Sequence, residues 1–287
     1  MTSRRERPRG RRLTPFPWFG GKTVHLKNIL PHLPEDATCF VDLFGGSAAV
    51  ILNVKPYPVE VYNDLDEDVV NFFKVLRENT EELIQAISLT PYSRKEFSLA
   101  LARSSTGGRI ERARQFYVRI MQCRSSSPTA TRDSDWRYSK LISERGMAAP
   151  AQKWGNRYTS LFLIAQRLKR IMIENRDFLH ILRQYDGSET LFYVDPPYVH
   201  ETRQRKRGYT HEMSTEDHLN LIHGLSTILG RFVLSGYDNE IYSEAIHSLG
   251  WSKVKFPPAR ATTSSNSKTR KIEVLWKNFS DDTEDLF

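Results

Sequence analysis

The chain has 287 residues, with 42 Lys and Arg against 34 Asp and Glu, which gives a net charge of +8. Its composition is 39% apolar, 11% aromatic and 26% charged, and this excludes collagen-like, disordered and membrane proteins. Two cysteines, Cys39 and Cys123, are too few for a disulfide framework or a metal cluster and suit a reducing compartment. Since the first residues also lack the apolar core of a secretory signal, we expect a cytoplasmic protein with no membrane contact.

Positive charge is concentrated in two parts of the sequence. Residues 1–13 carry six arginines against Glu6, a net of +5, and residues 92–160 carry fourteen basic against five acidic residues, a net of +9. The total of +8 therefore leaves −6 for the rest of the chain. An acidic body with a basic arm and a basic middle favours a polyanionic partner such as nucleic acid, although runs of charge are also typical of solvated surfaces.

The first third of the chain alternates between strand and helix patterns. Residues 38–44 form an apolar run that predicts a buried strand, ended by two glycines. Ser47 is a suitable N-cap for a helix of small residues over 48–53, and a second strand is expected at 59–62. From Glu67 onward, apolar residues recur at helical spacing. This order predicts parallel strands in a doubly wound α/β sheet.

A helical insertion is expected in the middle of the chain. The composition changes at Pro91, and the following stretch is rich in Arg and Ser without a convincing strand. Helical patterns cover 94–103 and 109–124, whereas 125–160 is expected to be rich in loops. We therefore predict a separate, mainly helical domain over 92–160.

Strand and helix patterns resume after the insertion. The expected elements are a long amphipathic helix at 158–173, strands at 191–194, 231–235 and 272–276, and helices at 215–229 and 239–249. A basic, polar loop occupies 259–271, and an acidic tail occupies 280–287. The predicted organisation is an arm at 1–13, a main α/β domain built from 14–91 and 161–279, the insertion, and the tail.

The sequence Asp195-Pro196-Pro197-Tyr198 directly follows the apolar run at 191–194. In an open α/β sheet, ligands bind beyond the carboxyl ends of the strands. Two prolines give a rigid, extended segment without backbone donors, so its carbonyls are free to accept hydrogen bonds. A carboxylate, a carbonyl and an aromatic ring suit a planar group that carries an amine. The alternative is a stiff turn with Tyr198 in the core.

Glycines and an acidic residue predict a nucleoside site near the first two strands. Gly45 and Gly46 lie at a strand-to-helix turn, where they let a ligand approach the backbone. Asp64 follows Gly45 by 19 residues, close to the spacing at which an acid accepts hydrogen bonds from ribose hydroxyls. Near the amino terminus, Trp18 could wall a flat ligand, and Lys22 could donate to a carboxylate.

The histidines are not expected to bind metal. His211, His218 and His223 are close in sequence, but after the predicted N-cap Ser214 they fall on a helix that lacks a second pair of ligands. We instead expect the basic cluster Arg203, Arg205, Lys206 and Arg207 to contact the phosphates of a nucleic acid, which would make binding sensitive to salt.

Four motifs in a fixed order carry a resemblance to a known family. They are PWFGGK, DLFGGS, NDLD and DPPY, and with the helical insertion they span residues 15–279. This arrangement is similar to the Dam-like DNA adenine-N6 methyltransferases that use S-adenosylmethionine, particularly phage and prophage members. The resemblance implies a Rossmann-like class I methyltransferase sheet, with residues 92–160 as the DNA target-recognition domain, acting on double-stranded DNA as a monomer in a bacterium or phage-infected host.

The resemblance also implies roles for individual residues. The cofactor-binding positions are Trp18, Lys22, Phe44, Gly45, Gly46, Asp64, Asp177 and Asp195, and the catalytic positions are Asp195, Pro196 and Tyr198. Many members have a glycine where this chain has Ala48, which we expect to be harmless in the first turn of a helix. We expect DPPY to hold the amine of an adenine flipped out of DNA, with Asp195 and the Pro196 carbonyl as acceptors and Tyr198 stacked on the base.

Two alternatives stay open from the residues. A cytosine-N4 DNA methyltransferase shares the DPPY motif, because Asp195 and Pro196 could hold either amine. A DNA-binding protein that keeps the methyltransferase fold without catalysis is the second.

Overall fold

A computed structural model of the 287-residue chain describes residues 12–103, 107–124, 135–143, 146–199, 209–256 and 272–280. Three sequence predictions lie outside these residues: most of the basic arm, the loop at 259–271, and nearly all of the acidic tail. The cluster Arg203, Arg205, Lys206 and Arg207, for which we expected phosphate contacts, also lies outside the described part.

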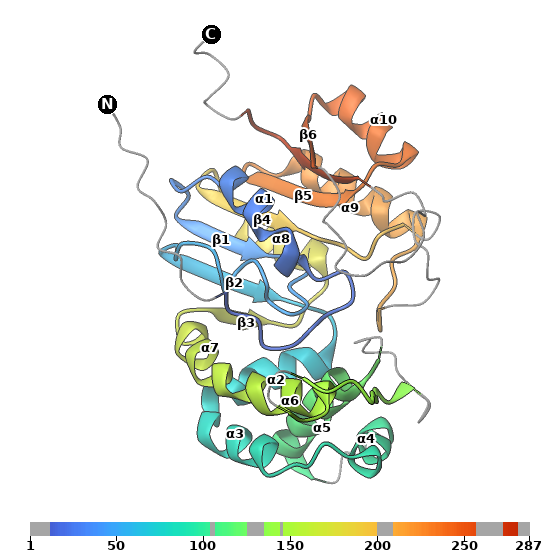
Figure 1. The fold of residues 1–287 in the computed structure, drawn as a ribbon. Coiled ribbons are helices and arrows are strands. Elements are labelled where there is room, and N and C mark those ends of the chain that lie inside the picture. Colours follow the sequence, from blue (N-terminus) through green and yellow to red (C-terminus); the bar gives the residue numbers. More distant parts are fainter. Residues whose placement is uncertain are drawn as a thin grey trace, which may run out of the picture.

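A seven-stranded sheet forms the centre of the described structure (Figure 1). Its spatial order is β3-β2-β1-β4-β5-β7-β6; the first five strands are parallel, and β7 is antiparallel to both β5 and β6. The strands are β1 Cys39–Asp42, β2 Val59–Asn63, β3 Met172–Glu174, β4 Thr190–Val194, β5 Arg231–Tyr237, β6 Ser252–Phe256 and β7 Glu273–Lys277. The predicted α/β class with a doubly wound sheet is confirmed.

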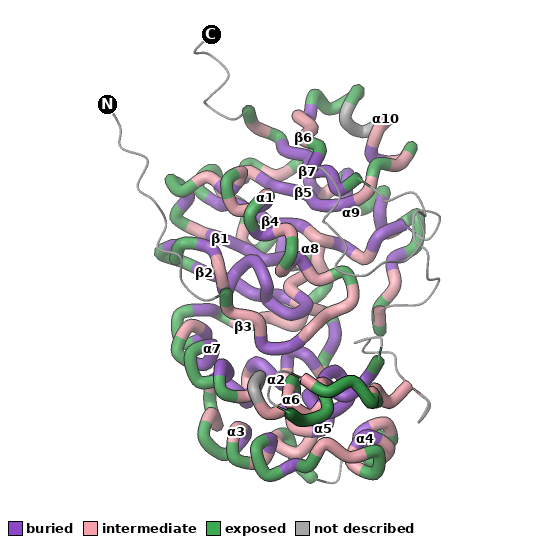
Figure 2. Tube along the Cα trace, viewed as in Figure 1, coloured by how far each residue is buried: buried purple, intermediate pink, exposed green. Residues whose placement is uncertain are grey.

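Alternating side chains of the strands divide the core into two layers. Phe40, Tyr62 and Tyr193 point to the face covered by α1, α2 and α7, whereas Val41 and Phe192 point to the face covered by α8, α9 and α10. The helices are α1 Leu26–Ile29, α2 Glu67–Glu78, α3 Thr80–Ser88, α4 Arg94–Leu101, α5 Gly108–Gln122, α6 Ala149–Arg157, α7 Leu161–Leu168, α8 Phe178–Tyr185, α9 Thr215–Thr227 and α10 Glu240–Leu249, with short 3-10 turns at Lys22–Val24, Leu30–His32 and Tyr158–Ser160. Figure 2 shows the buried strands between these helices. Two buried faces are the expected environment of a parallel sheet.

The helices α2 to α7 gather beyond β3, at one edge of the sheet (Figure 1). The predicted helices at 94–103 and 109–124 correspond to α4 and α5. α5 packs against α2, α3 and α4, so α2 joins the main sheet to the helical layer. α2 is suited to this position because Asp66 caps its first turn by accepting from the Asp68 amide at 2.9 Å, and its buried stripe includes Phe72 and Phe73.

Three local predictions were wrong. The helix expected over 48–53 is a series of turns, because Gly46 and Ala48 both have positive φ angles, 50° and 57°, which a right-handed helix does not allow. The long helix expected at 158–173 ends at Leu168, and the edge strand β3 follows it. Residues 125–160 were expected to be rich in loops, but this region contains the helix α6. Pro150 lies in the first turn of α6, a position that proline favours.

None of the described helices is both long and apolar enough to span a lipid bilayer.

Candidate active site

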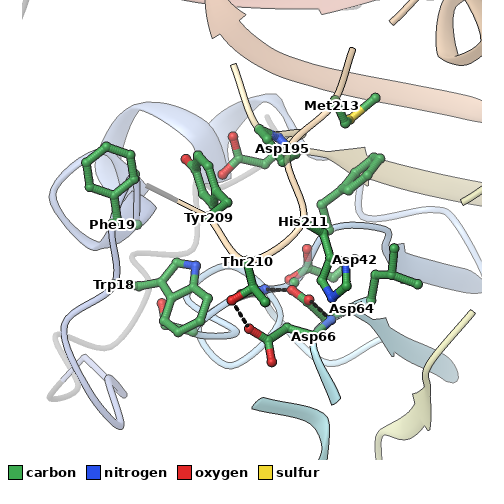
Figure 3. Close-up of a pocket in the computed structure, with 18 of the residues that line it drawn as sticks. Trp18, Phe19, Asp42, Asp64, Asp66, Asp195, Tyr209, Thr210, His211 and Met213 are labelled. Carbon is green, nitrogen blue, oxygen red and sulfur yellow. Dashed lines mark hydrogen bonds between the residues drawn. The ribbon is translucent and has the colours of Figure 1, made fainter. Parts of the chain in front are cut away.

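A pocket opens where β1, β2 and β4 end, at their carboxyl ends (Figure 3). All eight residues predicted to bind the cofactor line it: Trp18, Lys22, Phe44, Gly45, Gly46, Asp64, Asp177 and Asp195. These residues come from five separate parts of the chain, and the parallel register of the strands brings them to one edge. The structure therefore assembles the predicted set, and the roles of its members stay predictions.

The turn after β1 is shaped for close backbone approach. The Gly46 amide donates to Asp64 Oδ2 at 2.8 Å, and the Asp66 amide donates to Asp64 Oδ1 at 2.8 Å. A Cβ on Gly46 would lie 2.6 Å from the Trp18 indole nitrogen, and a Cβ on Gly45 would overlap the ring of Tyr62. Both glycines are thus required by packing as well as by the positive φ of Gly46.

The segment before α8 is fastened to the end of β2. Asn63 Nδ2 donates to the Arg176 carbonyl at 3.1 Å, and its Oδ1 accepts from the Arg176 amide at 3.0 Å. Asn175 Nδ2 donates to the Asp64 carbonyl at 2.8 Å. Asp177 caps α8 and lines the pocket next to Phe178, whose ring centroid is 5.6 Å from that of Phe44. These contacts hold one acid and two aromatic rings beside the turn.

Lys22 and Asp195, which both line the pocket, form a buried ion pair. Their Nζ and Oδ1 atoms are 2.7 Å apart, and the lysine is only 4% exposed. Lys22 Nζ also donates to the Gly20 carbonyl at 3.1 Å and lies 3.5 Å from Glu273 Oε1. Burial lowers the pKa of Lys22, but the charges of Asp195 and Glu273 overcome it, so the pKa is raised well above its usual value and the lysine is charged.

Only part of the DPPY motif lines the pocket together with Asp195. Pro197 lines the pocket, whereas Pro196 and Tyr198 are not among the residues that line it. The Tyr198 ring is 8% exposed, packs edge-on against Tyr237, and has Lys22 Nζ 4.7 Å above its centroid. Its hydroxyl donates a short hydrogen bond to Glu273. The expected stacking of a base on Tyr198 stays a prediction, and it requires the neighbours of this ring to move.

Three pocket carboxylates have raised pKa values. Burial raises the pKa of Asp42 to about 8, and the nearby charge of Asp195 adds to this effect. Burial also raises the pKa of Asp64 to about 6, against the opposing effect of its two amide hydrogen bonds. Asp195 has a pKa of about 6, because burial outweighs the attraction of Lys22. These are groups that a cationic or proton-donating ligand would stabilise.

One segment that lines the pocket was not predicted from any sequence motif. Tyr209, Thr210, His211 and Met213 line it, and the Thr210 hydroxyl lies beside Asp66 (Figure 3). Gly20 has a positive φ of 72°, and a Cβ there would collide with the Tyr209 hydroxyl, so this segment and the glycine fit each other closely.

One buried histidine makes a hydrogen bond within the core. The described residues contain no group of three or more His, Cys, Asp or Glu side chains able to hold a metal ion. His218 is buried, with Nδ1 2.8 Å from the Tyr242 hydroxyl.

A comparison with known protein families identifies the family of this chain. The sequence profile of the D12 class N6 adenine-specific DNA methyltransferases matches residues 18–256. The chain belongs to this family. The matched range contains the DPPY segment, the helical layer and all the residues that line the pocket. The chain is therefore an N6-adenine DNA methyltransferase.

Individual relatives agree with the family match over most of the chain. The type II methyltransferase M1.LlaDCHI of Lactococcus lactis subsp. cremoris is 24% identical over 289 residues, covering 93% of this chain and 96% of the relative. The type II methyltransferase M.CviBI of Paramecium bursaria Chlorella virus NC1A is 21% identical, covering 83% of this chain and 90% of its own. The DNA N-6-adenine-methyltransferase of Escherichia phage P1 is 36% identical over a shorter stretch, 24% of this chain and 9% of the phage protein. The predicted family resemblance and the predicted adenine specificity are confirmed.

Proposed function

We propose that this methyltransferase uses S-adenosylmethionine to methylate an adenine flipped out of double-stranded DNA, with Asp195 and Pro196 holding the target amine. The observation that carries the proposal is the position of Asp195. Its carboxylate lies at the carboxyl end of β4, lines the pocket and is oriented by the buried ammonium of Lys22 at 2.7 Å. Ligands of open α/β sheets bind at this edge.

The lining of the pocket fits the proposed cofactor. Among the described residues that line it, Lys22 is the single Lys or Arg, against seven carboxylates: Asp42, Asp64, Asp66, Asp177, Asp195, Glu212 and Asp217. S-adenosylmethionine supplies a methyl group on a positively charged sulfonium and also carries an ammonium, a carboxylate and ribose hydroxyls. An acidic pocket with one lysine suits that combination of groups. We propose Asp64 for the ribose hydroxyls, as the sequence predicts. Lys22 has three donors, which contact Asp195, Glu273 and the Gly20 carbonyl, so we propose that it binds a carboxylate of the cofactor by exchanging one of these partners.

Asp195 and the Pro196 carbonyl would act on the target amine. The exocyclic nitrogen of adenine is a poor nucleophile, because its lone pair is delocalised into the ring. Hydrogen bonds from its two protons to these oxygens favour a pyramidal nitrogen with a localised lone pair. Positive charge that develops on the nitrogen is then stabilised by the nearby carboxylate, and a pKa of about 6 makes Asp195 a better proton acceptor than an ordinary aspartate.

A ridge of aromatic and basic residues on the helical layer supports a DNA partner. The Arg94 guanidinium lies 4.6 Å from the Trp136 ring centroid, Trp136 stacks on Tyr138, and Arg124 lies 5.7 Å from the Tyr138 ring. The described residues that follow, 139–143 and 146–147, are mostly exposed (Figure 2). Charged and aromatic side chains in alternation suit phosphates and unstacked bases. We propose that residues 92–160 recognise the DNA target through this ridge.

Substitution of Asp195 tests the proposed chemistry. D195A should abolish transfer of a tritiated methyl group to an adenine-containing duplex, while S-adenosylmethionine still binds measurably in a calorimeter. D186A, an aspartate outside the pocket that binds the Leu229 and Gly230 amides, should keep activity. Substantial turnover by D195A would overturn the role of Asp195. Duplexes that lack either adenine or cytosine check the target base in the same assay.

The ridge is tested by DNA binding. W136A should weaken duplex binding by about tenfold, as expected for loss of one stacking residue, without changing cofactor affinity. F162A removes a half-exposed aromatic side chain of α7 and is the matched control. Equal DNA affinity for W136A and wild type would contradict the proposed recognition surface.

A further inference from the structure

We infer that Glu273 is a positioning residue for methyl transfer: from a place outside the pocket it binds Lys22 and Tyr198 and limits how strongly Lys22 pairs with Asp195. The inference rests on the proposed role of Asp195. Glu273 begins β7, about 80 residues after the DPPY motif, and does not line the pocket, so it is not expected to touch a ligand.

Glu273 is buried and engaged from three directions. Its Oε1 accepts the short hydrogen bond from the Tyr198 hydroxyl and another from Ser235 Oγ at 3.2 Å, and it lies 3.5 Å from Lys22 Nζ. The residue is 4% exposed. A carboxylate so far from water is strongly destabilised unless it is paired and hydrogen-bonded, so these contacts hold it in one place.

The geometry makes one ammonium serve two carboxylates. Lys22 Nζ is 2.7 Å from Asp195 and 3.5 Å from Glu273, so the two acids compete for a single positive charge. If Glu273 lost its charge, Lys22 would pair with Asp195 alone and would favour its ionised form more strongly. The negative charge of Glu273 therefore keeps Asp195 easier to protonate, in line with its contribution to the raised pKa of Asp195.

Glu273 also holds the aromatic ring of the DPPY motif. Tyr198 is fixed by the Glu273 hydrogen bond at its hydroxyl and by the edge contact with Tyr237, which pairs with Glu273 across the β5–β7 ladder. Because Tyr198 is only three residues after Asp195, this hold limits the freedom of the segment that carries the Asp195 carboxylate.

Other charged and titratable groups face this cluster from several elements. Around Glu273 these are Lys22 and His25 near the amino terminus, Asp195 and Tyr198 after β4, and Tyr237 on β5; around Lys22 and Asp195 they also include Asp42, Tyr193 and Tyr209. The pKa of His25 is lowered by burial, and Glu273 acts in the opposite direction. Burial raises the pKa values of Tyr193, Tyr198 and Tyr237, so these tyrosines stay neutral near pH 6, the pH at which Asp195 titrates.

The experiment compares the pH dependence of kcat for wild type, E273Q and E60Q at saturating cofactor and duplex. E273Q removes the charge and keeps an acceptor for the Tyr198 hydroxyl. Its loss of activity at low pH should begin about one pH unit lower than in wild type, which corresponds to a more ionised Asp195. E60Q is the matched control, because Glu60 is a buried strand glutamate that pairs with Arg167 far from the pocket. Its pH profile should coincide with that of wild type even if its thermal stability falls.

A second variant keeps the inference testable if E273Q does not fold. Y198F removes the hydroxyl that Glu273 binds. Glu273 then pairs more strongly with Lys22, and Lys22 stabilises the ionised form of Asp195 less. The low-pH loss of activity should therefore move to higher pH. Unchanged pH profiles in the variants that fold, or a shift of E273Q in the wrong direction, would overturn the role of Glu273. D195A in the same assay keeps the two proposals apart, because activity in D195A would overturn the role of Asp195 itself.

Discussion

The hydroxyl of Thr210 donates a hydrogen bond to Asp66 Oδ2 at 2.7 Å, joining residues 144 positions apart in the chain (Figure 3). Asp66 caps α2 with its other oxygen, and its amide is bound by Asp64. The contact therefore fastens the segment that crosses the pocket to the same turn that carries the predicted ribose acid.

Substitution of Thr210 should weaken cofactor binding. T210V preserves the shape of the side chain but removes the donor, and a hydrogen bond to a charged group contributes about 1.5–3 kcal/mol. We expect the Kd for S-adenosylmethionine, measured by calorimetry, to rise by about tenfold or more. T210S keeps the hydroxyl and should bind like wild type. If T210V also bound like wild type, the Thr210–Asp66 contact would have no part in holding the cofactor.

Activity should decline as the pH falls through about 6. Asp64 and Asp195 both have pKa values of about 6 because burial disfavours their charged forms. Protonation below that pH removes one acceptor for the cofactor and one for the target amine. We expect S-adenosylmethionine affinity and kcat to fall together between about pH 7 and pH 5, which calorimetry and tritium transfer can measure separately. Rates that stay constant down to pH 5 would contradict these assignments.

Asp64 and Asp195 could be predicted from the sequence because each directly follows a strand with a recognisable pattern. Asp195 follows the apolar run at 191–194, and Asp64 follows the strand expected at 59–62; the carboxyl ends of parallel strands meet at one edge of the sheet. The edge strands β3 and β6 were missed, since the first has three residues and the second alternates with lysines. Such strands lack the continuous apolar pattern of central ones.

The contacts of Thr210 and Glu273 could not be predicted from the sequence. Neither residue belongs to a local motif, and each is bound by a partner far away in the chain, Asp66 in one case and Tyr198 in the other. Such pairs depend on the register of the whole sheet and on the path of loops, which periodicity does not reveal. The prediction at Ala48 was wrong for a different reason: the helix was inferred from Ser47 as an N-cap and from the small residues after it, and neither feature reports the positive φ of Ala48.

Replacement of Ala48 by glycine should stabilise the folded protein. Its φ of 57° lies in the left-handed region, which costs a non-glycine residue roughly 1–2 kcal/mol. We expect A48G to raise the free energy of unfolding by up to about 1 kcal/mol, after the greater entropy loss of glycine is included. A49G is the neighbouring control: Ala49 is buried and has no positive φ, so its replacement should destabilise the protein. Chemical denaturation of both variants makes the comparison, and destabilisation of both would argue against strain at Ala48.

Asp42 should make the protein less stable as the pH rises from 4 to 8. The folded state raises its pKa to about 8 from a usual value near 3.8, so within this window the folded chain keeps a proton that the unfolded chain has lost. The stabilisation is fully present below the unfolded pKa and is lost as the pH rises through the folded pKa, with a slope of at most about 1.4 kcal/mol per pH unit for one group. D42N is uncharged at every pH and keeps an acceptor for the Ile51 amide. We therefore expect D42N to have a flatter dependence of Tm on pH and a higher Tm than wild type at pH 8.

D36N provides the contrast. The hydrogen bond from Arg231 lowers the pKa of Asp36, so removal of the Asp36 charge should not raise Tm at pH 8. A wild-type Tm that is constant from pH 5 to pH 8, or a D42N profile that follows it, would show that Asp42 ionises normally in the folded chain.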